Sequence, residues 1–142
     1  MPRLSVLALC IFASWSTAFA QNPRAVSAIQ ANGVYRHGDN EFRILALGSG
    51  TLKVQFDGIY VTAARGQNMG YATGEATLEG TVARFIPPDT QGCKITLTFS
   101  QNTLKVIQDG SDADCGFGHN VDATGTYRKI RGGKPKFESR PN

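Results

Sequence analysis

The sequence predicts an all-β fold in which about eight short antiparallel strands form a small barrel or sandwich with one disulfide, after a cleaved signal peptide. Three observations lead to this prediction. Apolar and polar residues alternate in short stretches, which is the pattern of strands with one buried face. Turn-forming residues separate these stretches at intervals of about 8–12 residues. Two cysteines, Cys93 and Cys115, remain once the leader is removed.

The first 20 residues have the layout of a secretory leader. Arg3 supplies the positive end, residues 4–20 are uncharged and largely apolar, and Ala18-Phe19-Ala20 matches a small-x-small cleavage site. Cys10 follows Leu9 inside the apolar stretch rather than a small residue, so we expect it to leave with the leader. The leader is short for a membrane span and no later run could serve as one, which predicts no transmembrane segment and an exported, periplasmic or extracellular protein.

The mature chain of 122 residues is long enough for one domain with its own core. Removing Arg3 lowers the formal charge from +4 to +3, which is too small to indicate nucleic-acid binding. We predict a connector at residues 21–32 with a turn or two of helix at 25–31, an antiparallel barrel domain at 33–130, and a basic disordered tail at 131–142. The alternative for the tail is a surface anchor at anionic lipid or cell wall.

The first strand is expected at residues 33–36, and the next two are expected at residues 41–47 and 51–61. If Ser49-Gly50 forms the turn between them, the register follows from the turn. The expected facing pairs are Leu47 with Leu52, Leu45 with Val54, and Arg43 with Phe56. Residues 62–73 contain two glycines and no sustained period, which predicts the longest loop between strands.

A further hairpin is expected at residues 75–78 and 81–86, with its turn at Glu79-Gly80 and Ala76 opposite Ala83. Pro87-Pro88 ends it, because proline cannot donate to a ladder. The last strand is expected at 121–129. The first and last strands share the pattern Gly-x-Tyr-Arg, at residues 33–36 and 125–128, and their pairing would close a barrel.

The clearest hairpin begins at Cys93. With Gln101-Asn102 as its turn and Asn102 at positive φ, its apolar residues share one face. The expected pairs are Phe99 with Leu104, Leu97 with Val106, and Ile95 with Gln108. Cys93 then lies opposite Gly110, and the following loop could return Cys115 to it. A disulfide is the leading interpretation, worth about 3 kcal/mol on the chain-entropy model. The alternatives are a reactive thiol or a metal site that recruits His37 and His119.

No catalytic motif is present, and the sequence predicts a protein that is not an enzyme and needs no cofactor or metal. His37 beside Asp39 in a turn lacks an identifiable nucleophile. Asp109, Asp112 and Asp114 place three carboxylates on one loop, where a calcium site is the alternative to carboxylates that accept hydrogen bonds from loop amides.

The segment from Gly110 to Val121, followed by Gly125-Thr-Tyr-Arg, resembles the end of certain small secreted bacterial proteins of largely unknown function. The layout over residues 33–129 is similar to that of periplasmic lysozyme inhibitors and lipocalin-like proteins. Those inhibitors carry a Ser-Gly-x-x-Tyr-type loop, whereas Ser49-Gly50-Thr51-Leu52 is followed here by Lys53. The resemblance therefore implies a fold and a compartment, and it transfers no inhibitory residue.

The sequence is compatible with two functions. The first is a secreted, non-catalytic binding protein that contacts another protein of the envelope or host through its loops, with inhibition of an envelope-directed enzyme as one form. Its candidate binding residues are Arg65, Asn68, Met69, Tyr71, Asp112, Asp114, Phe117 and His119. The alternative is a lipocalin-like carrier of a small apolar ligand. In that case the interior would be lined by Tyr35, Phe56, Phe99 and Tyr127.

Overall fold

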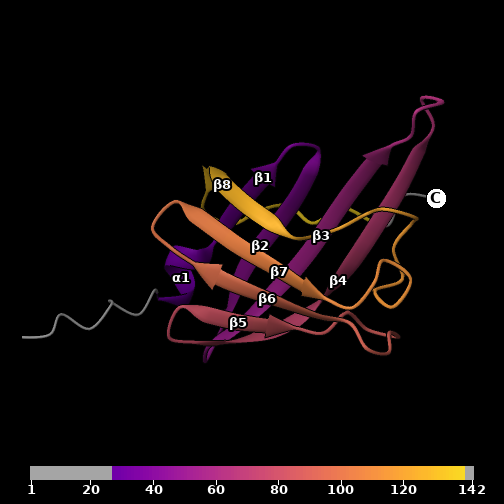
Figure 1. Cartoon of the computed structure of the whole chain (residues 1–142). Helices are drawn as coiled ribbons and strands as arrows, with labels where there is room; N and C mark the ends of the chain where they lie inside the picture. The colour runs from indigo at the N-terminus through magenta and orange to yellow at the C-terminus, as the bar shows by residue number, and fades with distance from the viewer. Residues whose placement is uncertain (1–26, 140–142) are drawn as a thin grey trace, which may run out of the picture.

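The computed structural model describes residues 27–139, which form a closed barrel of eight antiparallel strands joined in sequence order (Figure 1). The elements are α1 Ala28–Ala31, β1 Gly33–His37, β2 Asn40–Gly48, β3 Thr51–Val61, β4 Gln67–Glu79, β5 Val82–Phe85, β6 Lys94–Phe99, β7 Thr103–Asp109 and β8 Gly125–Gly132. The predicted fold class is confirmed. The predicted leader, residues 1–20, lies outside the described residues. Among residues 27–139, no helix is long and apolar enough to cross a bilayer.

The two Gly-x-Tyr-Arg segments close the barrel, as the sequence predicts. β1 pairs antiparallel with β8, with Tyr35 opposite Lys129 and Arg36 opposite Arg128. Both tyrosines play the same part. Tyr35 Oη donates to the carbonyl of Ala31 and Tyr127 Oη to the carbonyl of Ala123, each four residues upstream and each at 2.8 Å. Because the strands are antiparallel, these bonds lie toward opposite ends of the barrel.

The one-turn helix α1 lies at one end of the barrel, next to the start of β1 (Figure 1). Ser27 begins it with a capping box, in which its hydroxyl accepts from the Gln30 amide and the Gln30 side chain accepts from the Ser27 amide. Lys129 Nζ on β8 donates to the Gln30 carbonyl at 2.6 Å and lies 5.1 Å from the Tyr35 ring centroid. These contacts tie the end of α1 to the seam between β1 and β8.

Aromatic side chains occupy the barrel interior. Tyr35, Phe56, Phe99 and Tyr127 are each at most 2% exposed. Phe42 links two of them, with its ring centroid 4.8 Å from Phe56 and 5.0 Å from Tyr127. Pockets of about 460, 310 and 260 Å³ are lined mostly by side chains on the outer side of the wall.

The Cys93 hairpin follows its predicted register. Phe99 pairs with Leu104, Leu97 with Val106 and Ile95 with Gln108. The turn itself differs from the prediction, because Asn102 does not have a positive φ. The Ser100 amide donates to the Thr103 carbonyl at 2.9 Å across this turn. The apolar face determines the register of this hairpin, and more than one turn conformation is compatible with that register.

The predicted register between β2 and β3 is wrong by one residue. Phe42 pairs with Phe56 and Ile44 with Val54, and all four side chains are fully buried. A bulge between Ala46 and Gly48 inserts one residue beside the turn. Because a shift of one residue reverses every side chain, the expected facing pairs do not form. They were Leu47 with Leu52, Leu45 with Val54, and Arg43 with Phe56, and Leu47 is instead 49% exposed.

The prediction of a long loop at residues 62–73 is also wrong. β4 begins at Gln67, and its ladder with β3 runs without interruption from Val61–Gln67 to Thr51–Thr77. Glycines stand at inward-facing positions of β4, so the sequence lacks the alternation of apolar and polar residues that indicates a strand. They are needed because neighbouring side chains occupy the space that a Cβ would take. A Cβ at Gly70 would lie 2.7 Å from Val121 Cγ1, and one at Gly74 would lie 3.1 Å from a Phe85 ring carbon.

The β4–β5 hairpin turns one residue later than predicted. Glu79 pairs with Val82, so Gly80-Thr81 forms the turn, and Gly80 has a φ of 62°. Ala76 therefore faces Phe85 rather than Ala83, which faces Leu78. A shift of two residues leaves each side chain on its predicted side of the wall, so period-2 alternation could not detect it.

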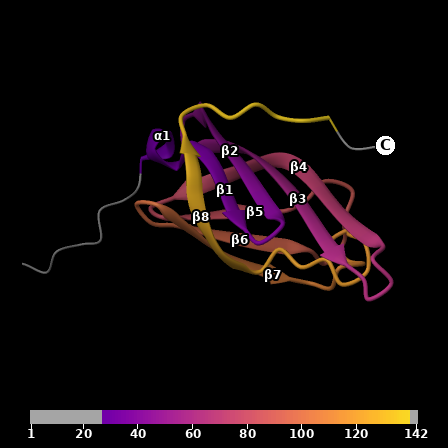
Figure 2. The same ribbon diagram turned by 90° about the horizontal axis from the view of Figure 1, so that it is seen from above.

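The end of the chain differs from the predicted disordered tail. β8 begins at Gly125 rather than at residue 121 and extends to Gly132, although Val121 and Ala123 are buried as expected. Residues 133–139 then run along the outside of the barrel, across β2, β3 and β4 (Figure 2). Pro135 is buried in this segment.

Candidate functional site

The β3–β4 hairpin projects beyond the rest of the barrel, at the end away from α1 (Figures 1 and 2). Its tip, residues 62–66, is a closed turn in which the Thr62 amide donates to the Gly66 carbonyl at 2.8 Å. The Gly66 amide donates back to Thr62 Oγ1 at 3.0 Å. Arg65 lies in this turn at a φ of 61°, and its side chain is exposed.

Exposed apolar side chains accompany this tip. Met69 is 50% exposed, Val61 51% and Tyr60 40%. Ile59 pairs with Met69 and Val61 with Gln67, which places all four on the outer side of the hairpin, whereas Tyr60 is on the other side. The hairpin end therefore presents apolar surface on both of its faces.

The loop between β7 and β8 docks against the inner side of this hairpin. The Gly118 amide donates to the Met69 carbonyl at 2.8 Å, and Asn68 Nδ2 donates to the His119 carbonyl at 2.7 Å. The Phe117 ring lies 5.1 Å from the Phe56 ring and enters the core. A Cβ at Gly118 would lie 2.8 Å from the Met69 carbonyl oxygen, so this approach requires glycine.

The same loop is held by the predicted disulfide and by its own carboxylates. Cys93 and Cys115 are bonded and only 4% and 2% exposed. Asp112 accepts from the Asn120 amide at 2.6 Å and the Ala113 amide at 2.7 Å, and these bonds lower its pKa. Ser111 donates to Asp114 through its hydroxyl and its amide, which lowers the pKa of that carboxyl. Within residues 27–139 no three His, Cys, Asp or Glu side chains are grouped to hold a metal ion.

The structure brings the two predicted binding segments together, but it gives their residues different roles. Arg65, Met69 and His119 are exposed, the last with 82% of its side chain accessible. Asn68, Asp112 and Asp114 satisfy loop groups. Phe117 is only 7% exposed and packs inward, while Tyr71 lies on the outer wall, where its hydroxyl donates to the Glu138 carbonyl at 3.3 Å.

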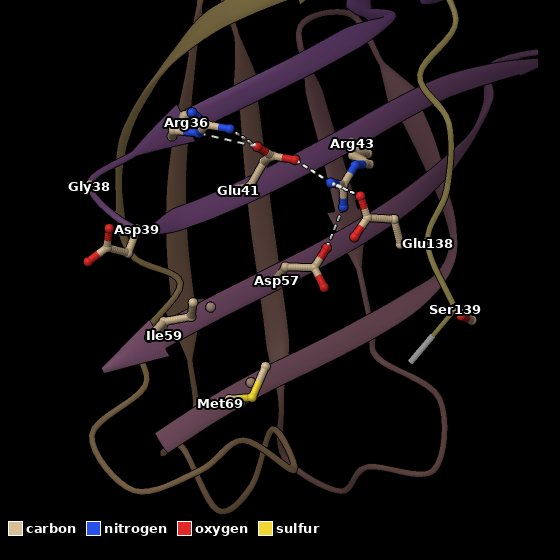
Figure 3. Close-up of a pocket in the computed structure, with 12 residues that line it drawn as sticks. Arg36, Gly38, Asp39, Glu41, Arg43, Asp57, Ile59, Met69, Glu138 and Ser139 are labelled. Atoms are coloured by element: carbon tan, nitrogen blue, oxygen red, sulfur yellow. Dashed lines mark hydrogen bonds and ion pairs between the residues drawn. The ribbon is translucent and has the colours of Figure 1, made fainter. Parts of the chain in front are cut away.

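A second feature, which the sequence did not indicate, is a charged pocket of about 460 Å³ on the outer wall (Figure 3). Arg43 is the shared partner of the pocket's ion pairs, with only 13% of its side chain exposed. Its guanidinium lies 2.7 Å from Glu41, 2.7 Å from Asp57 and 2.9 Å from Glu138. Arg36 adds a second cation, with Nη2 2.6 Å from Glu41.

Burial and charge act in opposite directions on the pKa of Asp57. Desolvation raises the pKa of Asp57, while Arg43 and a hydrogen bond from Gln55 Nε2 at 3.0 Å partly lower it. The alternating Glu41-x-Arg43 and Gln55-x-Asp57 do identify outward polar positions. Glu138, in contrast, lies in the segment that its composition marked as disordered.

No protein-family model, curated protein or solved structure matches the chain. The resemblance to small secreted bacterial proteins, periplasmic lysozyme inhibitors and lipocalin-like proteins therefore stays a prediction.

Proposed function

We propose that this is an exported, non-catalytic binding protein that contacts another protein through the end of the β3–β4 hairpin and the exposed part of the β7–β8 loop. The observation that carries the proposal is the projecting hairpin with Val61 and Met69 each about half exposed. Exposed apolar side chains grouped on one projecting element are typical of protein contact surfaces. Inhibition of an envelope-directed enzyme is the narrower form of this proposal.

The ordering of this surface supports the proposal. The hairpin tip is closed by its own hydrogen bonds, and the β7–β8 loop is held by the disulfide and by bonds to Asn68 and Met69. A surface that is ordered before binding loses little conformational entropy when a partner docks. The disulfide also fits an oxidising compartment, consistent with export to the periplasm or beyond.

The carrier alternative has weaker support. Its proposed lining residues do point inward, but the rings of Tyr35 and Phe99 pack edge to face, with their centroids 6.1 Å apart. Both tyrosine hydroxyls donate to backbone carbonyls. A carrier of an apolar ligand would need space among these rings. The pocket of about 460 Å³ is lined by charged side chains on the outer wall instead.

The test is a binding and inhibition assay against a panel of lysozymes of the c, g and i types, with peptidoglycan lysis as the activity readout. The double variant Val61→Ser/Met69→Ser should lose at least tenfold in affinity, about 1.4 kcal/mol. Ile86→Ser/Ile107→Ser removes exposed side chains (63% and 49%) elsewhere on the wall and should bind normally. If no lysozyme is bound or inhibited, the inhibitor form is wrong.

The wider proposal has its own readout. A photo-crosslinking amino acid at position 61 should join the protein to one specific partner in envelope extract, and the same group at position 107 should not. The captured partner must then bind the purified wild-type protein and bind Val61→Ser/Met69→Ser more weakly. Equal affinity for the two proteins would show that the hairpin end is not the contact surface.

A further inference from the structure

Residue Glu138 is held on the outer wall by one contact from each of three neighbouring strands. Arg43 on β2 binds its carboxylate, with Nη2 2.9 Å from Oε1. Gln55 on β3 accepts a hydrogen bond from its amide at 3.1 Å. Tyr71 on β4 donates to its carbonyl at 3.3 Å. Together these contacts recognise a side-chain carboxylate, a backbone N–H and a backbone C=O. These are the polar groups of one glutamate in an extended peptide.

The wall side of this site is built without the C-terminal segment. Arg43 is oriented by Glu41 and Asp57, and Gln55 is oriented by the bond from its amide nitrogen to Asp57. Gln55 is fully buried although it points to the outer side of the barrel. The bonds to Glu41 and Asp57 therefore keep the Gln55 oxygen and the Arg43 guanidinium aimed at the same place if Glu138 leaves.

The C-terminal segment is held by side-chain contacts, by the three bonds to Glu138 and by the burial of Pro135. Residues 134–139 form no ladder with the barrel, and they follow Gly132-Gly133, of which Gly133 has a φ of 77°. The Glu138 side chain is 68% exposed. Lys53 Nζ lies 4.4 Å from the centroid of the Phe137 ring, a surface contact of modest strength. Such a segment can detach while every strand pair of the barrel stays intact.

The segment also leaves part of this surface open. The charged pocket of about 460 Å³ extends beyond Glu138 and Ser139 toward Ile59 and Met69 (Figure 3). Without Glu138, the ion-pair cluster holds two arginines and two carboxylates and has no net charge, so the Arg43 guanidinium can accept one anionic side chain in place of Glu138.

We propose that this face of β2, β3 and β4 is a docking site for an extended, glutamate-containing peptide segment of a partner protein. Residues 134–139 occupy the site within the same chain as a displaceable strap. The recognition of N–H and C=O together with a carboxylate favours a peptide over a free carboxylic acid. This inference does not depend on the proposed function of the hairpin end, because Arg43, Gln55 and Tyr71 make the contacts with Glu138. The pocket shares only its far edge, at Met69, with the hairpin end.

The strap sets the affinity expected for a second peptide. A short flexible tether gives an effective concentration of about 1 mM. If a free peptide binds the open site with a Kd of about 100 µM, competition from the strap weakens its apparent affinity about tenfold.

The experiment uses the full chain and a fluorescein-labelled peptide with the sequence of residues 134–140, followed by fluorescence anisotropy. Glu138→Gln in the protein removes the strap's charged contact, and we expect this variant to bind the peptide about tenfold more tightly than wild type. The matched control, Glu75→Gln, removes an exposed carboxylate on β4 and should behave as wild type. A peptide with glutamine in place of its glutamate should lose at least tenfold in affinity for the Glu138→Gln protein.

Three outcomes would overturn the proposal. The first is absence of binding to both proteins, which would make the segment an integral part of the fold. The second is equal binding of the glutamate and glutamine peptides. The third is a Glu138→Gln protein that dimerises in light scattering and loses peptide binding, which would identify a second copy's segment as the occupant. Tyr71→Phe, made in the Glu138→Gln protein, removes only the hydroxyl that contacts the carbonyl, and it should weaken peptide binding several-fold while the unfolding midpoint changes little.

Discussion

Removing the two tyrosine hydroxyls tests how the barrel is closed. Tyr35 and Tyr127 are fully buried, and each donates a 2.8 Å hydrogen bond to the carbonyl four residues upstream. A net hydrogen bond contributes about 1 kcal/mol, and a buried carbonyl left without its partner adds to the cost of removing it. Phenylalanine keeps the ring and its packing. We therefore expect Tyr35→Phe and Tyr127→Phe each to lower the free energy of unfolding by about 1–2 kcal/mol.

The two hydroxyls should act independently. They lie toward opposite ends of the antiparallel β1–β8 pair, and the ring of Tyr35 contacts Phe99 while that of Tyr127 contacts Phe42. Effects at separated sites without shared partners add within about 0.5 kcal/mol. The double variant should then cost about 2–4 kcal/mol, measured by urea unfolding with linear extrapolation.

The same bonds predict an alkaline limit to stability. Burial raises the pKa of both hydroxyls above the ordinary value of 10.0. A raised pKa in the folded state means that stability is fully present below pH 10 and is lost as the pH rises toward the raised pKa. Each phenylalanine variant should lose less stability than wild type between pH 9 and 11. A cost below about 0.3 kcal/mol for both single variants, with an unchanged alkaline decline, would refute this account of the seam.

The structure also predicts how four other substitutions change the stability of the protein. Replacing both Cys93 and Cys115 with alanine should cost about 3 kcal/mol in urea unfolding, because the bond closes a separation of 22 residues; a cost below about 1 kcal/mol would contradict the entropic estimate. Gly70→Ala places a methyl 2.7 Å from a valine methyl of the docked β7–β8 loop and should cost about 1–3 kcal/mol. Gly132→Ala meets nothing within 4 Å and should change stability by less than about 0.5 kcal/mol. Hydrogen bonds lower the pKa of Asp112 below its ordinary 3.8, so its contribution is present above that pH and is lost as the pH falls through the lowered value. Asp112→Asn should make stability fall less between pH 5 and 3 than in wild type, and an unchanged acid profile would show that these bonds do not persist in solution.

The errors in strand register have two physical origins, a slide of two residues in one hairpin and a bulge in another. Alternation of apolar and polar residues specifies which face a residue occupies within a strand, but it is unchanged when a partner slides by two. For this reason the sequence predicts that Ala76 faces Ala83, whereas in the structure it faces Phe85. The β2–β3 error comes instead from taking the register from the turn, because the bulge beside Gly48 adds one residue that the turn alone does not indicate.

The functional surfaces were predicted unevenly for a related reason. The two segments around Met69 and His119 stood out because they are rich in glycine and polar residues, and the structure does bring them together. Their division into exposed and supporting side chains depends on the docked geometry. For example, Phe117 enters the core only because glycine occupies position 70.

Local chemistry was enough to predict an antiparallel β fold, a barrel or a sandwich, with the first and last strands as candidates for closure and Cys93–Cys115 as its disulfide. The tertiary structure decided that the barrel is closed. Alternation, turn residues and cysteine number are properties of short stretches, and they survive without knowledge of the rest of the chain. The tertiary structure alone decided that Glu138 meets Arg43 and Gln55. Glu138 is more than 80 positions from both residues and shares no local pattern with them, so only the folded wall brings the three side chains together as a site.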